Sequence, residues 1–442
     1  MFRIEFINKE VDVISMLYNS VLVRFSGEFG VKSSQTQDYI ENLLRGNIKN
    51  ALKTEGYAEL INRLQIISRQ GRYYLVPKTP ADSDIDTLIS IIGRMFGVSS
   101  VSPCFQSSMK EKTSLRTIPA KLMLANSLFP SKVEIRIFDK TEIDEKNWRK
   151  DIYELCEKFK KEDQDNNRVS KKRFEVNKNW KMGPWLCRRE KKLEIEVFEQ
   201  KAYITVERIK GPGGFPLGLE DPLVALVSGG IDSPVAAWMA MKRGAPIIMV
   251  IMNSSDGSGR PPSSDASVKE KALKEAKILS EYMIGFKEPK IFLVPYGKAL
   301  SELAKAGGDS GVTCLLCKRF MYRVAERVAY NYDAKGIVTG EILGEQASQT
   351  AQNLMVLNDI VHLPIFRPLF GFDKDEVIEK SRQIGTAIVS DMTQTPCFGV
   401  PDRPQTRAEI STVEKAEQKV HIEELIEECM KNTKQIMVKE LD

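Results

Sequence analysis

The sequence contains only two histidines among its 442 residues, so a histidine general base is hard to nominate from it. It also lacks any uninterrupted apolar stretch of the roughly 18–20 residues that a membrane span requires. The first residues already carry charges, and no secretory apolar region follows them. We therefore expect a cytoplasmic protein that makes no membrane contact.

The sequence also gives no sign of a disulfide framework. The chain has seven cysteines, an odd number, and no secretion signal precedes them. Such cysteines are better explained as thiols or ligands than as a set of disulfides. No internal repeat is evident either. With 42% hydrophobic residues the chain predicts globular structure throughout, and its length predicts two to four domains.

The segment Ser-Gly-Gly-Ile-Asp-Ser-Pro at 228–234 is the most informative feature that is present. It follows an apolar run at 223–227 and opens a helical pattern at 235–243, after which a second apolar run covers 247–252. Strand, glycine turn, helix and strand in this order predict one half of a doubly wound α/β sheet. Because such sheets bind ligands at the carboxyl ends of their strands, and because N–H groups at a helix start attract anions, we expect a phosphate or pyrophosphate here.

This glycine loop differs from two common nucleotide motifs. No Gly-Lys-Ser/Thr follows its glycines, and the spacing G-x-G-x-x-G is absent. Ser-Gly-Gly-x-Asp-Ser instead resembles the pyrophosphatase loop of enzymes that split ATP into AMP and pyrophosphate. A tight turn without a ligand is the alternative, but a packing turn needs one glycine and no quartet of polar groups. The candidate pyrophosphate-binding residues are Ser228, Gly229, Gly230, Ile231, Asp232 and Ser233.

Basic residues gather between positions 168 and 192. Ten lysines or arginines fall in this segment against two glutamates, and three aromatic side chains lie among them. Cations interleaved with aromatic rings suit a phosphate backbone with unstacked bases. A solvated charged face is the alternative explanation. The candidate nucleic-acid contacts are Lys171, Lys172 and Arg173.

A second chemical pattern is formed by cysteines. Cys314 and Cys317 make a C-x-x-C pair just before a helical run, and Cys397 follows about eighty residues later. Such a pair can hold zinc, an iron–sulfur cluster or a redox disulfide. The chain offers no convincing fourth ligand for a structural zinc ion. Three thiolates and an open position would suit a [4Fe–4S] cluster whose fourth iron accepts an external ligand.

Composition divides the chain into three parts. Helix and strand patterns, including a hairpin about Gly71, mix over residues 1–104, and a second mixed region that carries the basic segment follows over 105–210. A joint rich in glycine and proline at 210–216 leads into the α/β pattern of 211–442. We predict an α/β protein with a C-terminal doubly wound parallel sheet, preceded by two smaller α+β domains. A charged amphipathic helix is expected near the end, over 408–442, with its apolar face used for packing.

Taken together, the residues resemble the tRNA 4-thiouridine synthases, also called tRNA sulfurtransferases. The resemblance is strong in the C-terminal half, while the N-terminal half has its main anchors at 23–25 and 96–98. It implies a ferredoxin-like domain, a THUMP RNA-binding domain and an adenylating α/β domain. The motifs that carry it are Gly213-Gly214-Phe215-Pro216-Leu217-Gly218, the loop 228–234, Cys317-Lys318-Arg319-Phe320-Met321, the segment 339–350, Arg367-Pro368-Leu369 and Asp373-Lys374-Asp375-Glu376.

The resemblance implies ATP and Mg²⁺ as cofactors and tRNA as partner. ATP would adenylate uridine 8 at O4, and sulfur would then displace AMP to give 4-thiouridine. Asp232 would be essential to adenylation, and Lys318 would offset the charge that develops as O4 attacks the α-phosphate. The resemblance also implies that Gly340 and Glu341 lie near the nucleotide and that Gln346 and Ser348 contact the substrate. Cys397 matches the family's sulfur-handling cysteine. Cys314 and Cys317 match the paired cysteines of those family members that use a cluster.

Two departures from the family bear on the mechanism. Some relatives continue into a rhodanese domain with a persulfide cysteine, so here we expect an external sulfur donor, either sulfide or a cysteine desulfurase or persulfide carrier. Residues 253–264, rich in Ser, Gly and Pro, stand where relatives have histidine or aromatics after the second strand, so the adenine pocket there is left unassigned. A homodimer and a role in thiamine biosynthesis are compatible with the family.

Several alternatives stay open at this point. The three cysteines could instead form a persulfide relay in which Cys397 makes a transient disulfide with Cys314 or Cys317. A related tRNA thiolase that makes 2-thiocytidine or 2-thiouridine would carry the same loop. A small-molecule adenylating ligase would not need the basic segment, and an RNA-binding protein without activity would not need the intact loop.

Overall fold

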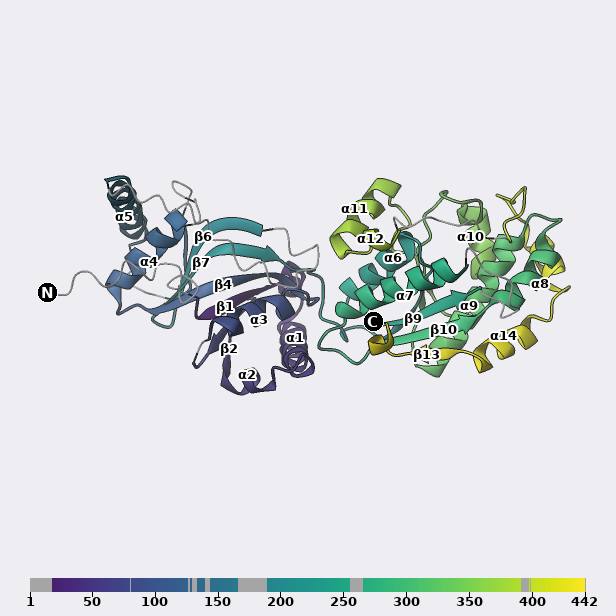
Figure 1. Ribbon diagram of the computed structural model, residues 1–442, viewed down its shortest axis with the longest axis horizontal. Helices are drawn as coiled ribbons and strands as arrows, with labels where there is room; N and C mark the ends of the chain where they lie inside the picture. The colour runs from purple at the N-terminus through teal and green to yellow at the C-terminus, as the bar shows by residue number, and fades with distance from the viewer. Residues whose placement is uncertain are drawn as a thin grey trace. The chain divides into compact units, whose positions relative to one another are not determined.

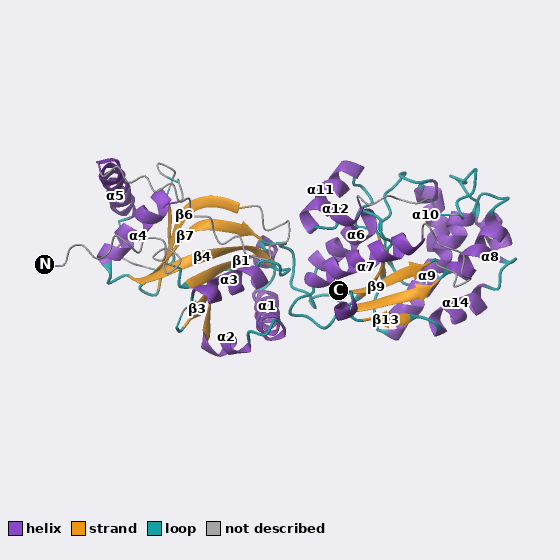
Figure 2. Cartoon of the chain, viewed as in Figure 1, coloured by secondary structure: helices purple, strands orange, loops and turns teal. Residues whose placement is uncertain are grey.

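The computed structural model describes residues 18–79, 81–125, 128, 133–139, 144–165, 189–254, 265–390, 397 and 399–441. The chain forms two compact units, which divide between Gly214 and Phe215 (Figure 1). Each unit is built on its own β-sheet, and each is considered by itself (Figure 2). Within these residues, no helix is both long enough and apolar enough to cross a membrane.

The N-terminal unit is built on a seven-stranded sheet with the order β2-β3-β1-β4-β7-β6-β5. The strands are β1 (Ser20–Phe25), β2 (Leu64–Arg69), β3 (Arg72–Pro77), β4 (Val98–Ser108), β5 (Glu134–Ile137), β6 (Arg189–Phe198) and β7 (Lys201–Lys210). Neighbouring strands run antiparallel except β5 and β6, which are parallel. The helices are η2 (Gly27–Val31), α1 (Ser34–Thr54), α2 (Ala58–Arg63), α3 (Asp82–Ile92), α4 (Lys112–Ala125) and α5 (Glu145–Asp165).

Local sequence signals explain much of this unit. The predicted hairpin is confirmed, since β2 and β3 pair antiparallel around Gly71, which has a φ of 75°. Helix α1 is capped by the Ser33 hydroxyl, which accepts from the N–H of Thr36. Helix α3 begins at Asp82, and the Asp84 carboxylate accepts from the N–H of Ala81.

The two regions predicted as separate α+β domains, 1–104 and 105–210, share this one sheet. Strand β4 runs through position 104 and pairs with β1 on one side and β7 on the other. One face of the sheet carries an apolar cluster with α4 and α5, which includes Ile195, Ile204 and Trp148. The division of these residues into two domains stays a prediction.

The C-terminal unit is built on a six-stranded sheet with the order β12-β11-β8-β9-β10-β13. The strands are β8 (Leu223–Leu226), β9 (Ile247–Asn253), β10 (Lys290–Pro295), β11 (Ile337–Val338), β12 (Ile365–Phe366) and β13 (Lys434–Ile436). All pair in parallel except β13, which is antiparallel to β10. The helices are α6 (Asp232–Lys242), α7 (Asp265–Glu281), α8 (Gly297–Gly307), α9 (Thr313–Asn331), η4 (Ala347–Gln349), α10 (Ala351–Asn358), α11 (Lys374–Ile384), α12 (Ala387–Ser390), α13 (Ile410–Glu417), α14 (Ile422–Lys431) and η5 (Val438–Glu440).

The strand order of this sheet reverses beside β8. The chain goes from β8 to β9 and β10 on one side, then returns to place β11 and β12 on the other side. Helices α6, α7, α11 and α12 pack with one another, whereas α8, α9, α10, α13 and α14 share a different core (Figure 1). The predicted α/β class with a doubly wound parallel sheet is confirmed. In such sheets ligands bind where the order reverses, here between the carboxyl ends of β8 and β11.

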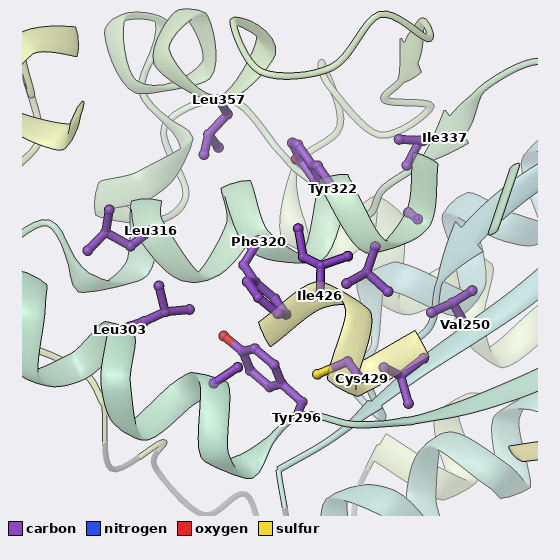
Figure 3. Packing of buried hydrophobic residues seen from close by; sticks show 14 of the residues in the cluster. Val250, Tyr296, Leu303, Leu316, Phe320, Tyr322, Ile337, Leu357, Ile426 and Cys429 are labelled. Carbon is purple, nitrogen blue, oxygen red and sulfur yellow. The ribbon is translucent and has the colours of Figure 1, made fainter. Parts of the chain in front are cut away.

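The core behind α9 holds the sheet and the C-terminal helices together. Tyr296, Phe320 and Ile426 are buried in it, with the rings of Tyr296 and Phe320 5.6 Å apart between centroids (Figure 3). The region 408–442, expected to form charged amphipathic helix, contains the helices α13 and α14, followed by β13 and η5. Its apolar side chains do pack, because Leu425 and Ile426 are buried in the same core.

Candidate active site

The glycine loop after β8 is shaped by a left-handed glycine and by two serines. Gly229 has a φ of 73°, and a Cβ there would lie 2.8 Å from the carbonyl oxygen of Val268 on α7. The Ser233 hydroxyl accepts from the N–H of Ser228 at 3.0 Å, and the two serine hydroxyls are also 3.0 Å apart. Only glycine satisfies both the backbone angle and the close approach at 229.

Helix α6 begins earlier than its sequence pattern suggests. The pattern predicted a start at Val235, but the helix starts at Asp232, so Asp232 and Ser233 lie on its first turn. Proline fits the first turn of a helix because the N–H that it lacks has no partner there, and Pro234 occupies that turn. The Asp232 carboxylate and the first backbone N–H groups of α6 therefore lie at the same end of the sheet.

The loop after β11 touches the start of α6. A Cβ at Gly340 would lie 2.7 Å from both the carbonyl carbon of Asp232 and the nitrogen of Ser233. Any larger residue would push the two loops apart. The structure thus brings the predicted pyrophosphate-binding residues at 228–233 and the predicted nucleotide residue Gly340 together at the point where the strand order reverses.

A lysine that the sequence analysis left without a role contacts Asp232. Lys374, the first residue of α11, donates to Asp232 Oδ1 at 2.8 Å and pairs with Glu345 Oε1 at 2.8 Å. Burial raises the pKa of the Asp232 carboxyl, with Lys374 acting in the opposite direction. The pKa of Lys374 is raised because hydrogen bonds to both carboxylates outweigh its partial burial, which acts to lower the pKa. One partly exposed cation is therefore shared by two acids beside the glycine loop.

Glu341, in the loop after β11, is buried and makes several polar contacts. Its carboxylate accepts from Tyr322 Oη at 2.7 Å and from Thr339 Oγ1 at 3.2 Å, and it pairs with Lys318 at 3.0 Å and Arg367 at 2.7 Å. Burial alone would raise the pKa of Glu341, but the two cations outweigh it and hold that pKa below its usual value. The ion pair with Glu341 thus holds the Lys318 side chain of α9 beside the loop after β11.

The thiols form a second group on the first turn of α9, close to Lys318. Cys314 and Cys317 are three residues apart on this turn, so they lie on one helix face. Cys317 Sγ shares a 2.6 Å hydrogen bond with the buried Tyr296 hydroxyl. Burial raises the pKa of the Cys317 thiol to about 12, and the Tyr296 hydrogen bond opposes this.

Cys397 lies within electrostatic reach of that pair. Charge on Cys397 adds to the burial that raises the pKa of both Cys314 and Cys317. Cys397 is exposed, and a Cβ on Gly399 would lie 3.7 Å from its sulfur and 3.2 Å from Leu300 of α8. All the cysteines of the described segments, 314, 317 and 397 included, are free thiols.

The side chains that could hold a metal ion are the thiols and carboxylates of this region. Among the residues with described placement, no three Cys, His, Asp or Glu side chains are grouped closely enough to hold a metal ion. The three thiols Cys314, Cys317 and Cys397 are of the type that binds a [4Fe–4S] cluster. Their sulfur atoms, however, are not grouped closely enough here to hold one. Asp232 and Glu345 do supply two carboxylates close together, which is enough for Mg²⁺ when phosphates complete its coordination.

The remaining predicted site residues are scattered. Gln346 is exposed in the loop after β11, whereas Ser348 is buried in η4. Lys171, Lys172 and Arg173, with nearly all of the basic segment, lie outside the described residues, as do positions 255–264 of the loop after β9. Their roles stay predictions.

Sequence reasoning missed several residues of this site: Lys374, Glu345, Arg367, Tyr322 and Tyr296. Lys374 and Arg367 stood inside segments that carried the family resemblance, but nothing local said which acids they meet. Glu345 directly precedes Gln346 and could have been found as a polar residue near the end of a strand. The two tyrosines had no sequence signal, because their hydroxyls bond to residues 19 and 21 positions away.

Glu275 of α7 is a further unexpected feature. It is fully buried behind the glycine loop, and within the described part of the chain neither of its carboxyl oxygens has a well-formed hydrogen bond. Burial raises its pKa to about 9, while the N–H of Gly229 and Lys271 act to lower it. A carboxyl group in this environment is neutral at pH 7.

Comparison with known proteins gives consistent matches across the chain. Residues 218–422 match the family described as thiamine biosynthesis protein (ThiI), and residues 20–102 match the ThiI ferredoxin-like domain. A probable tRNA sulfurtransferase of Thermococcus kodakarensis is 31% identical over 406 residues, covering 88% of this chain and 94% of the relative. The corresponding protein of Methanobrevibacter smithii is 32% identical over 416 residues, covering 94% and 99%.

Solved structures agree with these relatives. A crystal structure of a 4-thiouridine synthetase–RNA complex with bound ATP is 28% identical, with a TM-score of 0.73, and the match covers 95% of this chain and 99% of that one. A protein from Pyrococcus horikoshii is similar in fold, with a TM-score of 0.52, 21% identity, and coverage of 83% and 99%.

Proposed function

The chain belongs to the ThiI family of tRNA sulfurtransferases, which thiolate tRNA at the expense of ATP, and we propose that its product is 4-thiouridine at position 8 of tRNA. ATP would be split into AMP and pyrophosphate. The observation that carries this proposal is the contact of Gly340 with the start of α6, which sets the glycine loop, Asp232 and the loop after β11 around one point.

The nucleotide would bind with its phosphates against this point. Backbone N–H groups at the start of α6 and the Ser228 hydroxyl suit phosphate oxygens. Mg²⁺, held by Asp232 and Glu345, would neutralise phosphate charge when bound. Lys374 already lies between these two carboxylates, so a phosphate oxygen can take over one of its bonds.

The first chemical step would be adenylation. Uracil O4 attacks the α-phosphorus of ATP, the bond from that phosphorus to the bridging oxygen breaks, and pyrophosphate leaves. Negative charge develops on the phosphate oxygens, and Lys318 and Lys374 would lie where they can offset it. Glu341 keeps Lys318 in place through their 3.0 Å ion pair.

The second step would bring sulfur to C4 from an external donor, either sulfide or a persulfide carrier. We propose that Cys314, Cys317 and Cys397 handle it, because these thiols lie within electrostatic reach of one another. A [4Fe–4S] cluster on the three cysteines stays a proposal, and no step is assigned to it here since their placement does not have a cluster's spacing.

A persulfide relay is the second candidate for this step. This candidate requires the persulfide carrier as donor: its outer sulfur would pass to the Cys397 thiolate, and the carrier's own thiolate would leave. The terminal sulfur of the Cys397 persulfide would then attack C4, and AMP would leave. Cys317 or Cys314 would then attack the Cys397 sulfur, which releases 4-thiouridine and leaves a disulfide. An external thiol must reduce that disulfide, with two electrons, before the next turnover. The exposed Cys397 and the two partly buried thiols of α9 suit the donor-facing and resolving roles.

The basic segment and the whole chain's binding of tRNA belong to the same proposal. Lys171, Lys172 and Arg173 would contact tRNA phosphates, and Gln346 and Ser348 would lie near the substrate. Replacing the three basic residues together should weaken tRNA binding in a salt-dependent way. A small-molecule ligase would be unaffected by this change.

The test uses an unmodified tRNA transcript, ATP, Mg²⁺ and sulfide under anaerobic conditions. Pyrophosphate release that requires the transcript, with 4-thiouridine found at position 8 by mass spectrometry, is the expected result. Asp232→Ala should lose both. Sulfur at a cytidine or at another uridine would instead identify a related thiolase, and release without tRNA would identify a small-molecule enzyme.

Iron analysis of the same preparation separates the two sulfur mechanisms. About four irons per chain, lost on Cys397→Ala, would establish the cluster. Thiolation by iron-free protein supplied with a persulfide donor in place of sulfide, with a disulfide between Cys397 and Cys314 or Cys317 trapped after one turnover, would establish the relay.

A further inference from the structure

Two large apolar side chains remain exposed beside the candidate active site. Leu343 is 43% exposed and Phe370 is 47% exposed, although most large apolar side chains of this unit are buried. They come from different segments, but the Leu343 N–H donates to the Phe370 carbonyl oxygen at 3.2 Å. Exposed apolar residues that lie together at a polar site often mark a binding surface.

The two segments that carry these residues are tied together at both ends. Leu343 lies between Glu341 and Glu345 in the loop after β11, and Phe370 lies between Arg367 and Lys374 after β12. Arg367 pairs with Glu341 at 2.7 Å, and Lys374 pairs with Glu345 at 2.8 Å. The apolar pair is therefore held on a braced part of the fold, and no ordering of a free loop is needed before a ligand can contact it.

The same ion pairs connect the segments of Leu343 and Phe370 to Asp232 of the glycine loop. Lys374, which is bonded to Glu345, also donates to Asp232 at 2.8 Å. Phe370 is thus four residues along the chain from Lys374, which contacts the glycine-loop aspartate, and Leu343 is two residues from Glu345, which pairs with the same lysine. Phe366, also exposed, is different: its ring lies against Gly336, at the amino end of β11, because a Cβ on that glycine would be 2.5 Å from the ring.

The chemistry of this surface suits a nucleobase. An aromatic ring and an aliphatic side chain offer a flat apolar contact, and stacking on such side chains is how proteins hold single-stranded or extruded bases. The partly exposed Lys374 at its border supplies a positive charge for the phosphates of the same nucleotide. The surface lies on the β11 and β12 side of the point where the strand order reverses, whereas the glycine loop leads into α6 and toward β9.

We propose that Leu343 and Phe370 form the platform on which the target pyrimidine of tRNA stacks during the reaction, with Phe370 as the main contact. This inference rests on the proposed function and adds the residues that hold the reacting base. The base would lie across Gly340 from the phosphates, so that O4 can face the α-phosphorus.

The experiment compares Phe370→Ala and Phe370→Tyr with the wild type. Single-turnover thiolation of an unmodified tRNA transcript and tRNA-dependent pyrophosphate release are measured, together with ATP binding in the absence of tRNA. We expect the alanine variant to lose about 10- to 100-fold in both tRNA-dependent rates, the size of one base–aromatic stack. ATP binding should be unchanged, and tyrosine should restore most of the rate because it keeps the ring.

Ile388→Ala is the matched control. Ile388 is an apolar residue of α12 that is 77% exposed and lies outside the polar cluster, so its replacement should leave both rates unchanged. Wild-type rates in Phe370→Ala would overturn the proposal. A loss of ATP affinity by the same factor would also overturn it, since the surface would then bind adenine. An alanine variant with normal reaction on tRNA but lost binding of another protein would identify a protein-docking surface instead.

Failure of the inference and failure of the proposed function give different results. If the wild type shows no tRNA-dependent pyrophosphate release, the proposed function fails before any variant is compared. If the wild type is active and Phe370→Ala matches it, only the base platform is wrong.

Discussion

Two ion pairs, one from each unit of this protein, show opposite uses of charge. In the N-terminal unit, Arg24 pairs with Glu194 at 2.5 Å, and their side chains are 8% and 5% exposed. In the C-terminal unit, Lys374 pairs with Asp232 at 2.8 Å, and their side chains are 44% and 21% exposed. The first pair is removed from water, and the second lies at the end of a strand where water and ligands can reach it.

Their surroundings differ in the same sense. Arg24 also donates to Ser102, and Glu194 also accepts from Arg208, so this buried network connects β1, β4, β6 and β7. Lys374 is instead shared between two acids, Asp232 and Glu345. A buried network of this kind supports the fold, whereas an exposed cation shared by two acids can change partners when an anionic ligand arrives.

The strongest way to break the comparison is to disrupt the buried pair. Arg24→Leu leaves Glu194 buried with the more exposed Arg208 and Arg136 as its remaining cations. Removing one partner of a buried pair costs about 3 kcal/mol or more. We expect urea unfolding of the N-terminal unit at a clearly lower midpoint, with ATP binding by the C-terminal unit unchanged. Unaltered stability would show that the network contributes little to the fold.

Removing the exposed cation should have the reverse effect. Lys374→Met leaves Asp232 and Glu345 without their shared partner at the phosphate site, and we expect about a 100-fold loss of tRNA-dependent pyrophosphate release. Stability should change little, because ion pairs this exposed contribute at most about 1 kcal/mol. Lys298→Met, which removes an exposed pair with Glu428, is the control and should retain activity. A Lys374→Met variant with a lowered unfolding midpoint but normal pyrophosphate release would contradict the distinction between the buried and the exposed ion pair.

The third effect is expected from Glu275 and depends on pH. The folded protein keeps this carboxyl protonated up to about pH 9, whereas an ordinary glutamate has a pKa of 4.5, so folding takes up a proton between these values. The contribution of Glu275 to stability is therefore fully present below about pH 4.5 and falls as pH rises toward 9, by on the order of 1 kcal/mol per pH unit within that window.

Glu275→Gln should remove this dependence, since glutamine resembles the neutral acid at every pH. Unfolding midpoints in urea, measured at pH 6, 7 and 8, should fall less for this variant than for the wild type. Glu270→Gln, on the exposed side of the same helix, should follow the wild-type slope. Parallel curves for all three proteins would show that Glu275 is ionised in the fold.

How far the sequence predicts this molecule depends on the distance over which a feature acts. The hairpin at Gly71, the glycine loop and the C-x-x-C pair are made by residues within a few positions of one another, and their geometry follows from local backbone chemistry. The start of α6 at Asp232 was missed because its first turn reads as part of the loop. The single sheet shared by residues 20–210 was not expected either, since a strand that joins two regions looks like any other strand.

The sequence by itself determined the class of the C-terminal sheet, the position of the glycine loop and the family, because each of these is encoded by short runs with a distinctive order. Only the tertiary structure decided which charges meet. Lys374 and Asp232 are 142 positions apart and Arg367 and Glu341 are 26 apart, yet each pair is in contact. Parallel strands end at one edge of a sheet regardless of their separation along the chain, so the partners of these side chains are set by strand order, which no local pattern contains.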